Sequence, residues 1–159
     1  MLEQSWKIMC VLWNDRGNMW VARICFSLLF LVAGVGKLFN WQGSVEGLAL
    51  TFVEWQMLLG EGALSERVQE VLSASTEILM GGAVFLEIVG ALLILLGYKT
   101  RIGAVFLLLF LIPVTLVMHP FWFRVSGEVY QELMVFLKNL SLIGALLFVV
   151  LTPASKQVE

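Results

Sequence analysis

Five polar side chains in this sequence have the chemistry to form a site within otherwise apolar surroundings: Lys37, Glu87, His119, Lys138 and Asn139. Glu87 lies near the middle of a long apolar run, where an unpaired carboxylate would take up a proton or recruit a cation. If the five converge, they form a cavity with a carboxylate, ammonium groups, an imidazole and an amide. Such a cavity would bind a polar head group whose apolar remainder lies in lipid, or would pass protons.

Plainer interpretations of the same residues stay open. A buried pair of Glu87 with Lys37 or Lys138 can serve only to fix the register of packed helices. His119 fits an interfacial hydrogen bond better than metal ligation, because no second His and no neighbouring Cys accompanies it. The pattern therefore predicts no metal site.

The composition indicates where such residues would be held. Hydrophobic residues make up 60% of the chain and charged residues 14%, whereas soluble domains have about 45–50% and about 25%. A soluble fold this short could not bury so much apolar surface, so lipid is the expected solvent. A net charge of -2 argues against a nucleic-acid partner, which would require a basic stripe. Cys10 and Cys25 form no Cys-x-x-Cys pair and are interpreted as inert.

Four apolar runs are long enough to cross the hydrocarbon core as helices. Isolated strands in lipid would leave backbone groups unpaired, which favours helices. The sequence thus predicts an all-α fold, an integral membrane four-helix bundle within a domain of residues 19–151, with Pro113 kinking the third helix. The predicted spans are Met19 to Phe39, Thr76 to Leu96, Gly103 to Met118 and Glu132 to Leu151.

Basic residues in the short connections predict the orientation of the bundle. With the N-terminus inside, the cytoplasmic side carries Lys7, Arg16, Lys99, Arg101 and Lys156, and the other side carries Arg67 and Arg124. Both termini are therefore predicted to be cytoplasmic, as an amphipathic segment of residues 1–18 and a tail of residues 152–159. Arg23 and Arg101 are expected to anchor the inner end.

A long outer loop, from Asn40 to Ser75, is predicted after the first helix. Its stretch Val45 to Leu59 mixes aromatic residues and leucines with glutamates, which suits a lid on the membrane interface or simple anchoring by an aromatic belt. Ser65 is predicted to cap a short helix that begins at Glu66.

Helical periodicity predicts which faces pack. Small residues three and four positions from Glu87 indicate a helix contact face, and the larger residues opposite suit lipid. Glu87 is therefore expected to point into the bundle. The contact face is Ala83, Val84, Gly90 and Ala91, and the lipid face is Phe85, Ile88, Leu92 and Leu95. In the first span, one continuous face holds Arg23, Ser27, Phe30, Gly34 and Lys37.

Four motifs in this order resemble the DoxX family over nearly the whole stretch from Met19 to Leu151. They are Arg23 with Phe30-Leu31-Val32-Ala33-Gly34 and Lys37; Glu87-Ile88-Val89-Gly90-Ala91-Leu92 with Gly97-Tyr98-Lys99-Thr100-Arg101; His119-Pro120-Phe121-Trp122; and Phe136-Leu137-Lys138-Asn139-Leu140 with Gly144. The resemblance implies a bacterial inner-membrane protein of four helices with a link to redox metabolism. Its relatives include a subunit of a thiosulfate–quinone oxidoreductase, but function is not uniform across the superfamily.

The leading hypothesis is a membrane subunit or accessory of an oxidoreductase system that binds a quinone-like lipid. Glu87 would be the catalytic, proton-exchanging carboxylate. Lys37, Lys138 and His119 would donate hydrogen bonds to quinone oxygens, and Asn139 would orient one of them. No covalently bound cofactor is expected, and electrons would come from a soluble redox partner protein, so whether the chain is itself an enzyme stays open.

Two hypotheses from other classes stay beside it. One is a non-enzymatic membrane scaffold for partner proteins, and the other is a small-solute or proton transporter. A bundle this small often self-associates, so a homo-oligomer is also left open.

Overall fold

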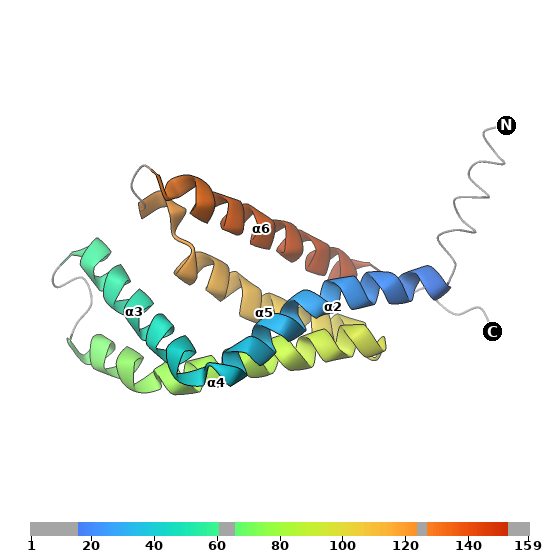
Figure 1. The fold of residues 1–159 in the computed structure, drawn as a ribbon, viewed down its shortest axis with the longest axis horizontal. Helices are drawn as coiled ribbons and strands as arrows, with labels where there is room; N and C mark the ends of the chain where they lie inside the picture. Colours follow the sequence, from blue (N-terminus) through green and yellow to red (C-terminus); the bar gives the residue numbers. More distant parts are fainter. Residues whose placement is uncertain (1–15, 61–65, 124–126, 153–159) are drawn as a thin grey trace.

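The computed structural model describes residues 16–60, 66–123 and 127–152. Four of its helices correspond to the predicted spans: α2 (Arg16–Phe39), α4 (Glu66–Leu96), α5 (Thr100–Met118) and α6 (Val129–Leu151) (Figure 1). Each contains a window long and apolar enough to cross a membrane. No strand occurs in these described ranges. The predicted all-α, four-helix membrane bundle is confirmed.

The long connection after the first span is present, and most of it is helical. Helix α3 (Trp41–Leu59) occupies its first half, and α4 begins at Glu66. The short helix predicted there is therefore the start of the second spanning helix, while the Ser65 cap lies outside the described residues. At 31 residues, α4 is about 46 Å long, which exceeds a hydrocarbon core of about 30 Å. Its first turns must extend beyond the core.

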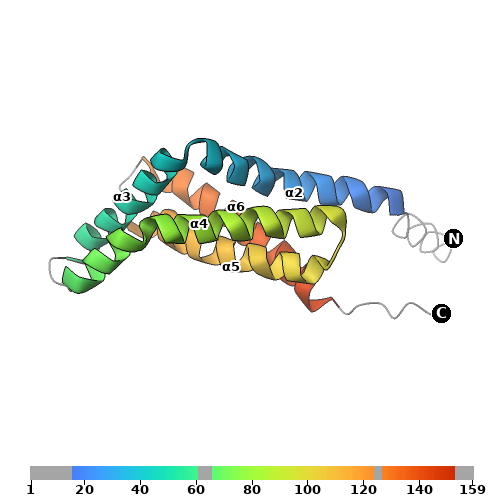
Figure 2. The ribbon, with the colours of Figure 1, turned by 90° about the horizontal axis from the view of Figure 1, so that it is seen from below.

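Helix α4 occupies the middle of the arrangement. Helix α2 packs on one side of it and α5 on the other (Figure 2), and α6 packs against α5. The buried core joins all four spanning helices and comprises Phe30, Ala91, Ile94, Ala104, Leu107, Leu108, Phe110, Leu111 and Leu146.

Helices α4 and α5 approach each other most closely near the turn that joins them. A Cβ added to Gly90 would lie 2.9 Å from the Gly103 carbonyl oxygen, and one added to Gly103 would lie 2.8 Å from the Gly90 carbonyl oxygen. Only glycine fits at both positions without a backbone shift. In the turn itself, Gly97 has φ +68°, and the Arg23 guanidinium occupies the space where its Cβ would lie.

The described charges are distributed unequally between the two ends. The start of α2 and the end of α6 lie at one end (Figure 1), which carries Arg23, Lys99 and Arg101. There Arg101 donates a hydrogen bond to the Thr152 carbonyl at the C-terminus of α6, a favourable position for a cation. The anchoring role predicted for Arg23 and Arg101 stays a prediction. The cytoplasmic location of this end stays a prediction, and residues 1–15 and 153–159 lie outside the described residues.

Candidate functional site

Lys37 and Glu87 form an ion pair between α2 and α4. The distance from Lys37 Nζ to Glu87 Oε2 is 2.7 Å, and the Glu87 side chain is 2% exposed. Gly34 allows this approach, because a Cβ there would lie 3.4 Å from Glu87 Oε2 and 2.7 Å from a side-chain carbon of Ile88. The prediction that Glu87 points into the bundle is confirmed.

The two predicted helix faces are largely found as expected. Ser27, Phe30 and Gly34 are buried on α2, and Val84, Gly90 and Ala91 are buried on α4. On the opposite face of α4, Phe85 and Leu92 are exposed. Ile88 differs from its predicted lipid-facing position, because it packs against Gly34. Because Gly34 has no side chain, α2 can approach α4 closely enough to cover Ile88.

The Lys37 ammonium lies between the Glu87 carboxylate and the ring of Phe110. Its nitrogen is 5.3 Å from the centre of the Phe110 ring, within the range of a cation–π contact. An ammonium group has three N–H donors, and the Glu87 carboxylate accepts from it. The lysine is 29% exposed, in contrast to its partner. Its remaining donors are therefore available to a ligand.

Beside this pair is a cavity of about 420 Å³ lined by residues of α3, α4 and α5. Lys37 is the one charged residue among those lining it, and the others are apolar. They are Leu48, Phe52, Ile78, Leu79, Met80, Gly82, Ala83, Leu86, Leu109, Phe110, Pro113, Val114, Val117 and Met118. An apolar cavity with one convergent cation is typical of a site for an amphiphilic small molecule.

Pro113 contributes to the chemistry of the cavity wall. Helix α5 continues through it, although proline has no N–H for the carbonyl four residues earlier. That carbonyl belongs to Leu109, which also lines the cavity. The backbone of α5 therefore has an acceptor without its usual helical donor in this stretch.

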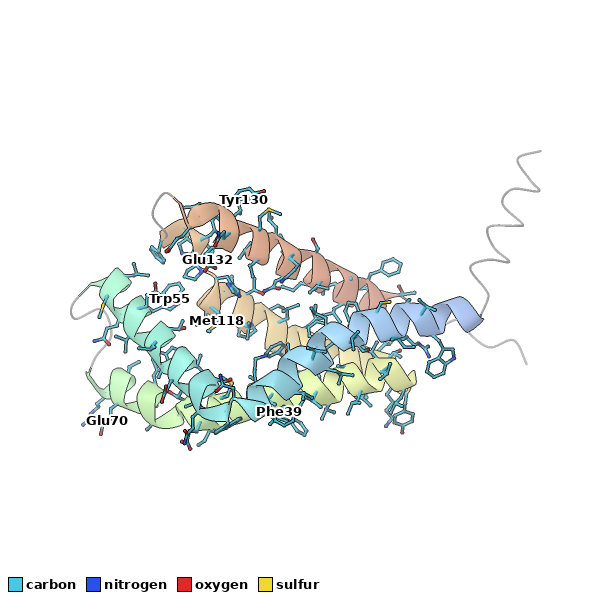
Figure 3. All side chains as sticks on the ribbon, in the orientation of Figure 1. Phe39, Trp55, Glu70, Met118, Tyr130 and Glu132 are labelled. Carbon is cyan, nitrogen blue, oxygen red and sulfur yellow. The ribbon has the colours of Figure 1, made fainter. Side chains whose placement is uncertain are left out.

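Helix α3 covers the cavity near the far end of α5. The Trp55 indole N–H donates to the Val117 carbonyl at 2.7 Å, one of the last carbonyls of α5 and hence without a helical partner. The Trp55 ring also meets Phe123 edge-on at 5.4 Å between ring centres. Figure 3 shows Trp55 on α3 and Met118 at the end of α5. The predicted lid is thus a helix tied to α5; its location at the membrane interface stays a prediction.

His119 makes a separate side-chain hydrogen bond, with Glu132. Its Nδ1 lies 2.9 Å from Glu132 Oε2, and the two side chains are 26% and 27% exposed. The pair joins the end of α5 to the start of α6 (Glu132 is labelled in Figure 3), next to the ring contact of Phe121 with Phe136. His119 therefore makes the hydrogen bond of the plainer interpretation. Sequence reasoning missed Glu132, although the short connection between the end of α5 at Met118 and the start of α6 at Val129 brings the two helix ends together.

Lys138 does not join the cavity. It is exposed on α6, whereas the next residue, Asn139, is 7% exposed. Neighbouring residues on a helix point about 100° apart, so a helix that buries Asn139 turns Lys138 outward. Neither lines the cavity. Of the five residues expected to converge, the structure brings together Lys37 and Glu87.

Comparisons with known proteins agree with this architecture. The DoxX family model matches residues 19–120. The inner membrane protein YphA of Escherichia coli K12 is 27% identical over 132 residues, which cover 83% of this chain and 80% of that protein. No solved structure matches the chain. The four apolar helices and the inner-membrane relative support a multi-pass protein of the bacterial inner membrane. The chain belongs to the DoxX family.

Proposed function

We propose that this DoxX-family protein binds a quinone-like lipid in the cavity beside Lys37, as a membrane subunit or accessory of an oxidoreductase system. The observation that carries the proposal is the Lys37 ammonium, held by the buried Glu87 carboxylate at the edge of an otherwise apolar cavity of about 420 Å³. A cation placed in surroundings of low dielectric constant interacts strongly with any polar group that reaches it.

The residues of the cavity fit a quinone-like molecule. Its ring is apolar except for carbonyl oxygens, which are hydrogen-bond acceptors. Lys37 would donate an N–H to one such oxygen, and the apolar side chains around it would exclude water. When bound, the quinone supplies two-electron, two-proton redox chemistry, with electrons provided by a partner protein.

Lys37 and Glu87 would also handle the proton. Once Lys37 Nζ has given a proton to the ligand oxygen, the Glu87 carboxylate, whose Oε2 lies 2.7 Å away, can take up a proton from the aqueous side and pass it to the neutral amine. Glu87 thereby positions the ammonium and relays its replacement proton. His119, Lys138 and Asn139 are not part of this revised site, because none lines the cavity.

Binding of decylubiquinone to the purified protein in lipid nanodiscs tests the site. Lys37→Met should weaken binding by about tenfold or more, the loss of roughly one charge-assisted hydrogen bond. Since this variant leaves Glu87 unpaired, the double variant Lys37→Met/Glu87→Gln is measured beside it and should bind equally poorly while remaining folded. Lys99→Met removes the same charge from an exposed position and is the matched control. Unchanged binding in the double variant would refute the proposal.

Turnover in native membranes tests the role of Glu87. Glu87→Gln retains the side-chain shape but cannot exchange a proton as a carboxylic acid does. We expect it to lower quinone-dependent turnover while the amount of protein in the membrane stays the same. Parallel losses of turnover and abundance would indicate a folding role. Unchanged turnover together with intact partner co-purification would favour the scaffold hypothesis instead.

A further inference from the structure

We infer that the cavity opens sideways to the hydrocarbon between α4 and α5, with Gly82 at its threshold, and therefore takes a ligand whose long apolar tail stays in lipid. This inference rests on the proposed function and adds the route and the shape of the ligand. It concerns a part of the cavity away from the Lys37–Glu87 pair.

The opening is defined by residues that line the cavity and are nevertheless exposed. Ile78 is 78% exposed, Leu109 58% and Leu79 45%, and all three line the cavity. Gly82 and Pro113 are exposed lining residues as well. These exposed lining residues all lie within the two membrane-spanning windows, Ala74–Leu96 and Thr100–Phe123. A molecule at this opening therefore meets lipid chains, not water.

Other walls of the cavity are closed by packed side chains. Met80 and Phe110 are 7% and 5% exposed, and both line it. On another side, α3 contributes Leu48 and Phe52 and is fastened to α5 by the hydrogen bond from Trp55 to Val117. A head group at Lys37 would thus leave its tail to exit along the exposed wall.

Gly82 is not required by helix packing. A Cβ added there would meet no atom within 4 Å, in contrast to Gly90 on the same helix. Along the helical repeat of four, Gly82 lies between Ile78 and Leu86, which are both lining residues. The missing side chain therefore leaves a gap in a row of large apolar residues, at the point where a tail would cross α4.

A pair of probes with the same head and different tails tests the inference. Decylubiquinone carries a tail, and 2,3-dimethoxy-5-methyl-1,4-benzoquinone carries none; both are measured with the protein in nanodiscs. Gly82→Phe should weaken binding of the tailed probe by about tenfold or more and change that of the tailless probe by less than about twofold. Gly36→Phe is the matched control, because Gly36 lies in the α2 span, has nothing within 4 Å of its Cβ position and does not line the cavity.

Photolabelling of the unsubstituted protein locates the tail directly and does not depend on the Gly82→Phe substitution. A ubiquinone analogue with a diazirine at the end of its tail should label the stretches 76–86 and 105–116. Equal weakening of both probes by Gly82→Phe, or labelling concentrated on α6, would overturn the lateral opening. Failure of the unsubstituted protein to bind either probe would instead overturn the proposed function, and the inference with it.

Discussion

Helices α4 and α5 behave differently at the two ends of their shared length. Near their connecting turn, the backbones at Gly90 and Gly103 touch so closely that a Cβ at either would collide with a carbonyl oxygen. Toward α3, the same two helices form walls of a cavity of about 420 Å³. Each end contains a glycine on α4. Atoms of α5 occupy the space where a Cβ of Gly90 would lie, whereas the corresponding space at Gly82 is open.

The two ends of the bundle therefore differ in how closely their helices pack. Without a hydrophobic driving force in lipid, close backbone packing has to supply much of the association between helices, and the end near the turn supplies it. At the other end the two helices instead line the cavity. The Lys37–Glu87 pair lies between the two, with the carboxylate toward the packed core and the lysine at the cavity.

The largest expected effect comes from breaking the pair between the two regions. Lys37→Met leaves the Glu87 carboxylate buried without its cation and should lower the free energy of unfolding by about 3–5 kcal/mol. Unfolding in mixed micelles as SDS is added measures this loss. The double variant Lys37→Met/Glu87→Gln should recover most of it. A loss below about 1 kcal/mol in the single variant would show that the pair is not desolvated as its burial implies.

An added methyl group compares the two glycines directly. Gly90→Ala forces its Cβ against the Gly103 carbonyl at 2.9 Å and should destabilise the bundle by about 1–3 kcal/mol. Gly82→Ala, on the same helix, meets nothing and should be neutral or stabilising by up to about 1 kcal/mol. The same SDS titration measures both variants. Equal losses would contradict the division between a packed and an open end.

The smallest effect is expected from the hydrogen bond between His119 and Glu132 at the open end. His119 and Glu132 lie 2.9 Å apart but are each about a quarter exposed, so Glu132→Gln should cost less than about 1 kcal/mol. A double-mutant cycle with His119→Asn isolates the coupling between the two side chains. A coupling as large as that of Lys37 with Glu87 would mean that a partner or lipid buries this end.

Much of the fold could be predicted from the sequence because its signals are local. Long apolar runs gave the four spans, and small residues around Glu87 gave the inward face of α4. The connection after α2 was harder to predict. Its glutamates and aromatics indicated a lid, yet α3 becomes a cavity wall only through contacts with α4 and α5, among them the bond from Trp55 to Val117, 62 positions away.

From the sequence alone it follows that Glu87 is inside a membrane bundle and needs a proton or a cation, since burial of an unpaired carboxylate in lipid is too costly. The sequence left Lys37 and Lys138 as equal candidates. The tertiary structure decided for Lys37, because the rotation of α6 that buries Asn139 turns Lys138 outward. The separation of α4 from α5 likewise created the cavity. Such rotations and separations depend on packing between segments far apart in the chain, and no local pattern encodes them.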